Sequence, residues 1–139
     1  MPFSNYLQNK ILAAVLNDAA YAAGATVYVG LSTTTPDETS GATNFTEPSG
    51  NAYARVAVAA NTTNWPAPTD STSGATVSNA TAITFPQATG SWGTVTYAGL
   101  FDAATGGNLL AYGALTTPQT ISSGGQLSFQ AGELPLSLN

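Results

Sequence analysis

The sequence predicts a mainly β fold, an antiparallel β-sandwich or a small barrel, preceded by one N-terminal amphipathic α-helix. Near the start, apolar residues recur at helical spacing, and after Gly24 they alternate with polar ones instead. Seven short segments rich in β-branched and aromatic residues then follow, and no helical pattern separates them, which disfavours a βαβ fold. A chain of 139 residues has about the length of one domain. We therefore expect a single domain over residues 1–139, with the helix at about 4–23 and the β-domain at about 25–138.

The predicted helix runs from Ser4 to Ala23. Ser4 is a typical N-cap, Phe3 can pack back on the first turns, and Gly24 suits the position just after the helix. One face combines Leu7, Ile11, Ala14, Val15 and Asp18, and Leu12 and Leu16 widen it. An apolar stripe of this kind has to be buried, either on the chain's own sheet, which is the simpler expectation, or on a neighbouring subunit.

The predicted strands are short and are bounded by Gly, Pro, Asn or Ser. They comprise Thr26–Thr33, Tyr53–Ala59, Thr81–Phe85, Gly93–Asp102, Asn108–Thr116, Gln126–Gln130 and Glu133–Leu138.

A hairpin with its turn at Asp102–Asn108 is the strongest local prediction. Gly106 and Gly107 provide the positive φ angles that such a turn needs. Strict alternation would place each strand's apolar residues on one face. These sets are Val95, Tyr97, Gly99 and Phe101 on the first strand, and Leu109, Ala111, Gly113 and Leu115 on the second.

Two connecting segments, Thr34–Asn51 and Asn61–Ser78, exceed the usual loop length. Phe45 and Trp65 are their apolar residues most suited to insertion into a partner, and the alternative is that they pack over their own core. Arg55 lies within a strand, where it is either solvated or forms a salt bridge to another subunit. The interface candidates are therefore Phe45, Trp65 and Arg55.

The charge balance narrows the choice of partners. The chain has two basic and seven acidic residues, a net charge of −5, and only 6% charged residues, against about a quarter in average soluble proteins. Two separated cations cannot neutralise a phosphate backbone or hold an anionic membrane, so nucleic acid and membrane are not expected as partners. A protein surface with so few charged residues is either covered by small polar residues or hidden against other subunits.

The chain contains neither Cys nor His, which excludes thiol nucleophiles, the usual zinc sites and triads with an imidazole base. A glycosidase with two carboxylates is the one common hydrolase that remains. Apart from Asp18 in the predicted helix, however, the acidic residues lie in loops and turns, where Asp and Glu usually form turns or aid solubility. We therefore expect no enzymatic activity and no catalytic, cofactor-binding or metal-binding residue.

A family resemblance covers nearly the whole chain. The segments SNYLQNKILAAVL, ATVYVGLST, GNAYARVAV, NATAITFP and SWGTVTYAGLFDAATGGNLLAYGALT occur in that order. They resemble a family of small virion structural proteins of tailed bacteriophages, described as tail-fibre-like or capsid decoration proteins. The resemblance implies a place in the virion after assembly in the host cytoplasm, and it carries no catalytic residue.

Within that family, the short, compact and weakly charged chain favours a capsid cement protein. Such a protein stabilises the shell by binding the major capsid protein or other virion proteins, and we expect a homo-oligomer, a trimer, because interface cores are depleted of charge. The alternative is a tail fibre or baseplate component, with receptor or glycan binding as a further alternative, for which Trp65 or Trp92 would provide a stacking surface.

Overall fold

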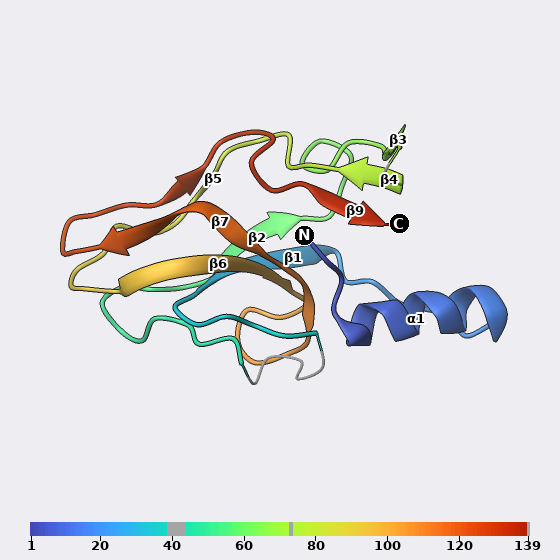
Figure 1. Cartoon of the computed structure of the whole chain (residues 1–139), viewed down its shortest axis with the longest axis horizontal. Helices are drawn as coiled ribbons and strands as arrows, with labels where there is room; N and C mark the ends of the chain where they lie inside the picture. Colours follow the sequence, from blue (N-terminus) through green and yellow to red (C-terminus); the bar gives the residue numbers. More distant parts are fainter. Residues whose placement is uncertain (39–43, 73, 139) are drawn as a thin grey trace.

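A four-stranded antiparallel sheet organises the computed structural model, which describes residues 1–38, 44–72 and 74–138. Its strand order is β2-β1-β6-β7, so β2 and β7 are the edges and the sheet is open (Figure 1). The strands are β1 (Thr26–Ser32), β2 (Val56–Ala59), β6 (Gly93–Phe101) and β7 (Leu109–Ile121). The hairpin predicted around Asp102–Asn108 is confirmed, because β6 and β7 pair on either side of that turn.

Two smaller antiparallel sheets lie over one face of the main sheet (Figure 1). One contains β3 (Thr69–Ser71), β4 (Gly74–Val77) and β9 (Leu136–Leu138), and the other β5 (Ile83–Thr84) and β8 (Ser128–Phe129). The main core joins residues of both layers, including Val29, Leu31, Val95, Leu100, Ile83, Phe85, Phe129 and Leu134. The prediction of a mainly β, antiparallel fold with one N-terminal helix is confirmed, and its layers follow the sandwich alternative.

The opposite face of the main sheet is covered by the segment before β2. Phe45 packs there with Phe101 and Leu109 in a second, smaller cluster. The two phenyl rings meet edge to face, with centroids 5.0 Å apart, an arrangement that adds to the stabilisation from burial. The main sheet is therefore covered on both faces around Phe101 and Leu109, while residues 116–120 of β7 stay exposed.

The helix α1 (Asn5–Leu16) begins where expected and ends early. The Ser4 hydroxyl accepts a hydrogen bond from the Leu7 amide, which is the predicted N-cap. At the other end Asp18 has a φ of 52°, and the Ala19 amide bonds back to the carbonyl of Ala13. This left-handed residue stops the helix, so the predicted extension to Ala23 is wrong.

Residues ahead of the helix pair with the outer edge of β7. The Ser4 amide donates to the Leu110 carbonyl at 2.8 Å, the Tyr112 amide donates to Pro2 at 3.2 Å, and the buried Ser4 hydroxyl donates to Leu109. The chain start thus forms an isolated β-bridge with β7, between Phe3 and Ala111, and the helix extends from it away from the β layers (Figure 1).

The expectation that the helix buries its stripe on the chain's own sheet is wrong. No residue of α1 is buried, and Leu12, Val15 and Leu16 are 57%, 73% and 74% exposed. Only the first turns lie against the sheet, because the anchor is at Ser4 and the axis points outward. The apolar end of the helix has no partner within the described part of the chain.

Two strands, β3 and β4, were not predicted. Both lie inside the segment Asn61–Ser78, which the sequence indicates only as a loop. Their residues are mainly Thr, Ser, Ala and Gly and show no apolar alternation, so pairing between backbones creates a hairpin that a hydrophobic pattern cannot reveal. Conversely, β7 continues to Ile121, beyond the predicted end at Thr116.

The predicted faces of the hairpin are partly wrong, because the β6–β7 register shifts twice. Between Leu100 and Phe101 one extra β7 residue is inserted, so Leu109 packs with Phe101 while Leu110 joins the main core. Because of a second register shift between Val95 and Tyr97, the Val95 side chain packs in the main core. Bulges reset the alternation that a strict period of two assumes.

The close packing at Gly99 yields a stability prediction. A Cβ atom on Gly99 would lie 2.6 Å from Phe45 Cε2 and 2.9 Å from Leu109 Cδ1. We expect Gly99→Ala to lower the free energy of unfolding by about 1–3 kcal/mol in urea titrations, because overpacked cores are strained. Gly24→Ala is the matched control, since its nearest contact would be an ordinary 3.6 Å. Equal stability of the two variants would contradict this packing.

Candidate functional site

Three polar side chains form a cluster beside β1, where its pairing with β2 has ended, and we call Arg55, Glu47 and Tyr53 the charged cluster. Arg55 Nη2 lies 2.8 Å from Glu47 Oε2, and Nε donates to Oε1 at 2.9 Å, which makes a two-pronged ion pair. The Arg55 side chain is 5% exposed and that of Glu47 is 25% exposed. Paired geometry of this kind offsets the cost of burying the guanidinium.

Arg55 also holds the β6–β7 turn. Its Nη1 donates to the carbonyls of Ala103 at 2.7 Å and Gly106 at 2.9 Å, and its guanidinium carbon lies 3.5 Å from the Phe101 ring centroid. The side chain is therefore covered and paired within its own chain, so the alternative of a solvated position is wrong. The predicted strand Tyr53–Ala59 also begins too early, because β2 starts at Val56 and Arg55 lies just before it. A role for Arg55 at a subunit interface stays a prediction.

Tyr53 links the ion pair to the main core. Its hydroxyl donates to Glu47 Oε1 at 2.7 Å and accepts from the Leu31 amide at 2.9 Å, while its ring stacks near Phe85 and meets Trp92 edge-on. Burial raises the pKa of Tyr53 far above its usual value, and the nearby Glu47 carboxylate raises it further. The phenol is a fixed structural hydrogen-bonding group.

Phe45 is 7% exposed and lies against its own sheet. Of the two alternatives that the sequence leaves for this residue, packing over its own core is the arrangement found. Residues 39–43 of the same predicted loop, Thr34–Asn51, lie outside the described residues.

Trp65 lies in an apolar groove of about 450 Å³ between the main sheet and the sheet β3-β4-β9. We call this the Trp65 groove, and its lining comprises Val27, Ala60, Asn61, Thr62, Trp65, Val77, Leu100 and Leu136. The indole Nε1 is buried and has no hydrogen-bond partner among the described residues, which is rare for a buried donor. By contrast, Trp92 is buried in the core and donates to the Asn51 carbonyl, so it offers no stacking surface.

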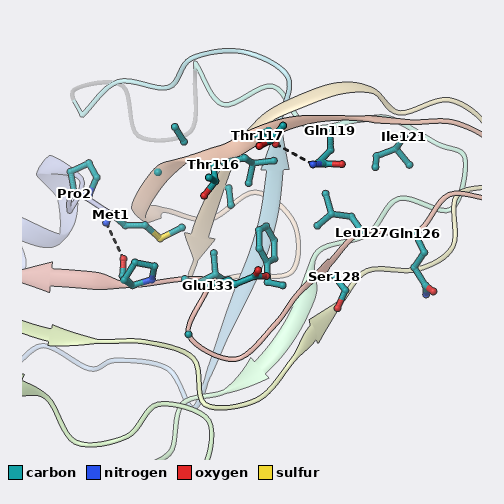
Figure 2. A pocket seen from close by; sticks show the side chains of 18 residues that line it. Met1, Pro2, Thr116, Thr117, Gln119, Ile121, Gln126, Leu127, Ser128 and Glu133 are labelled. Atoms are coloured by element: carbon teal, nitrogen blue, oxygen red, sulfur yellow. Dashed lines mark hydrogen bonds between the residues drawn. The ribbon is translucent and has the colours of Figure 1, made fainter.

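A larger cavity of about 780 Å³ lies between β7 and the segment 126–135 (Figure 2). Polar residues on its walls are Thr116, Thr117, Gln119, Gln126, Ser128 and Glu133. The Met1 ammonium donates to the Pro135 carbonyl at 2.9 Å, and burial lowers its pKa. Hydroxyl and amide groups make up most of the polar lining, and Glu133 is the acidic side chain among them.

The acidic side chains do not gather into a site in the part of the chain that the structure describes. Asp102 accepts hydrogen bonds from the amide and side chain of Asn108, and Glu133 accepts one from the Gln130 amide. Within residues 1–38, 44–72 and 74–138, no group of three or more His, Cys, Asp or Glu could hold a metal ion. In the same residues, no helix has the length and apolarity needed to cross a bilayer.

Comparison with known proteins identifies one family. A family model described as Podophage GP4 fiber I protein gp80 matches residues 2–137. No curated protein matches the chain. The match spans the helix, the main sheet, both smaller sheets and the groove, so it applies to the whole arrangement described above.

We expect the Glu47–Arg55 pair to be worth more than an exposed ion pair. Glu47→Gln should lower the free energy of unfolding by about 1–3 kcal/mol, because it leaves a covered guanidinium without its countercharge. A double-mutant cycle with Arg55→Met, measured by urea titration, isolates the coupling. Additive effects would contradict a direct interaction. Asp70→Asn in the exposed strand β3 is the matched control and should change stability by less than about 0.5 kcal/mol.

Alkaline pH should destabilise the fold through Tyr53. Because its pKa is raised in the folded chain, the stabilisation is complete below the usual value of 10.0 and is lost as the pH rises above it, where unfolding releases the phenolic proton. Urea titrations between pH 8 and about pH 11 should show a falling free energy of unfolding. Tyr53→Phe should be less stable at neutral pH and should show a shallower decline, and an unchanged slope would contradict this role.

Proposed function

The chain belongs to the family of podophage GP4 fiber I proteins, and on this premise we propose that it is a non-enzymatic structural component of a tail fibre in a phage virion. The observation that carries the proposal is the match over residues 2–137, which leaves almost no part of the chain outside the family. Its partners in this role are other virion proteins.

This family favours the tail-fibre alternative over the capsid cement protein that compactness and low charge had suggested. Those properties describe one subunit, and a fibre built from several chains can be long although each chain is short. Low charge supports a buried interface in either location. The capsid shell and its major protein are therefore not the partners proposed here.

The way the chain uses its polar groups supports a structural role. Its covered cation binds Glu47 and two backbone carbonyls, and Asp102 and Glu133 accept hydrogen bonds inside turns. These groups stabilise loops and a hairpin turn. A rigid sheet with anchored loops suits a structural component of a virion.

Of the three interface candidates, Trp65 offers the most direct surface, because it lies in an open apolar groove. Phe45 and Arg55 would act through the segment and turn that they hold in place. The trimeric state expected from the sequence is a further part of the proposal, and the charge-free groove supports contact between subunits without naming their number.

Receptor or glycan binding is a second candidate function, favoured by the larger cavity. Hydroxyl and amide side chains line it next to Leu127 (Figure 2). Leu115 and Pro135 belong to the same lining. Sugars present alternating hydroxyl and C–H surfaces, and a site of this composition can bind both. Its walls include no Lys or Arg.

The location in the particle can be measured directly. Purified virions of the source phage, labelled with an antibody to this chain, should show label at the tail under the electron microscope. Quantitative mass spectrometry should find far fewer copies than of the major capsid protein. Labelling of the major capsid protein is the control. Label spread over the shell at capsid-like copy number would contradict the tail-fibre role and restore the cement interpretation.

A further inference from the structure

The larger cavity is bounded by the edges of two strands. Its lining includes the consecutive residues 113–117 of β7 and the consecutive residues 126–129, which contain β8. The face of a strand would contribute every second residue, because successive side chains point to opposite sides, so an unbroken run means that the strand edge faces the cavity. β7 is an edge of the main sheet and β8 pairs with β5. Along these two runs, neither edge has a neighbouring strand in the part of the chain that the structure describes.

The backbone of β7 directs hydrogen-bonding groups at the cavity. On this edge, the Tyr112 amide donates to the Pro2 carbonyl at 3.2 Å. Because alternate residues of an antiparallel strand direct their N–H and C=O groups to the same side, Ala114 is the next residue whose two groups point outward. Ala114 is exposed. Pro118 has no N–H, so the stretch that offers donors ends there.

The start of the chain already pairs with the adjoining part of this edge. Phe3 forms a β-bridge with Ala111, and the pairing ends at Pro2. Met1 then crosses to the opposite wall, where its ammonium donates to the Pro135 carbonyl at 2.9 Å (Figure 2). The unpaired run 113–117 therefore continues an edge on which an extended segment is already bound.

We propose that an extended segment of another virion protein enters this cavity and pairs with residues 113–117 of β7 as an additional strand. At about 3.3 Å per residue, the run accommodates about five residues of the segment. Strand addition takes its affinity from backbone hydrogen bonds, and an extended backbone is the ligand that matches an unpaired strand edge. This inference goes beyond the proposed function by naming a surface and the chemistry of its partner. It rests on the proposed function only in taking the partner from the virion.

The recessed position of the edge favours a single extended segment over a folded partner. Exposed edges of two folded sheets can meet directly. Here the segment 126–135 forms the opposite wall of the cavity, so the edge of another sheet, with its covering layer about 10 Å away, would collide with that wall. One extended chain needs only the space between the two walls.

Charge narrows the sequence of the segment. Among the described residues that line the cavity, Glu133 has the only charged side chain, and the whole chain has a net charge of −5. A segment with Lys or Arg opposite Glu133 is therefore favoured and an acidic segment is repelled. This chain cannot supply such a segment itself, because Lys10 lies within α1 and Arg55 is held by Glu47. The partner is thus a different protein and not a second copy.

A library of random peptides of about seven residues provides the probe. The purified chain should enrich peptides that alternate apolar and polar residues and carry one Lys or Arg. A selected peptide, made synthetically, should bind in calorimetry and should slow hydrogen exchange of the backbone amides in residues 113–117, because strand pairing protects them. If no such peptide is enriched, or if the peptide binds without this protection, the proposal is wrong.

Backbone methylation separates strand addition from binding through side chains alone. Two versions of the selected peptide carry N-methyl groups on alternate residues, each version in one of the two possible registers. The version whose methyl groups face β7 should bind about tenfold or more weakly, and the other should bind like the unmodified peptide. Equal effects of the two versions would contradict pairing with β7.

Variants of the chain test the same contact. Ala114→Pro removes the amide at the centre of the pairing and should weaken binding about tenfold or more, whereas Ala114→Ser keeps the amide and is the matched control. Glu133→Gln should weaken binding of the Lys-bearing peptide by roughly threefold, because an exposed ion pair contributes little. Circular dichroism checks each fold. Unchanged binding by folded Ala114→Pro would overturn the proposal, and if that variant does not fold, the methylated peptides decide.

A soluble sugar chain tests the other occupant of the cavity. Maltoheptaose should not displace the selected peptide. If it does, the cavity is a glycan site and strand addition is wrong. All these measurements use the purified chain, so their failure leaves the tail location, which is measured on virions, unaffected.

Discussion

The buried ion pair between Arg55 and Glu47 is the constraint on which the packing of the segment before β2 and of the β6–β7 turn depends. A guanidinium that is 5% exposed is tolerated only while both carboxylate oxygens and the carbonyls of the hairpin turn remain in reach. These contacts hold three segments in place. They are the residues just before β2, which include Arg55, the earlier segment that contains Glu47, and the β6–β7 turn. Gly30 belongs to the same solution, since a Cβ atom there would lie 2.9 Å from Glu47 Oε1.

The overall fold could be predicted because its signals are local. Alternating apolar residues mark β1, β2 and β6, and Gly106 and Gly107 mark a turn whose positive φ angles are observed. The boundaries depend on interactions that a linear pattern does not contain. A left-handed Asp18 ends the helix, and inserted residues shift the β6–β7 register. The polar hairpin β3–β4 has no apolar period and gives no such signal.

The candidate site could be predicted less well than the fold, because it depends on which residues contact each other in the folded chain. Arg55 could be singled out as a rare cation in a strand, yet its partner lies eight residues away in a segment that reads as a loop. Phe45 and Trp65 look alike in sequence, as apolar residues in long loops, and only packing separates the buried ring from the one in an open groove. The exposure of Leu12, Val15 and Leu16 depends on the direction of the helix axis, which Ser4 and β7 determine together.

The pairing of Pro2–Ser4 with β7 has a consequence for biosynthesis. The Ser4 hydroxyl binds a carbonyl 105 residues further along the chain, so the ribosome releases the helix long before its anchor exists. Contacts of such sequence separation form late, after the entropy of closing the intervening loop has been overcome. We therefore expect α1 to be the last element to reach its final position.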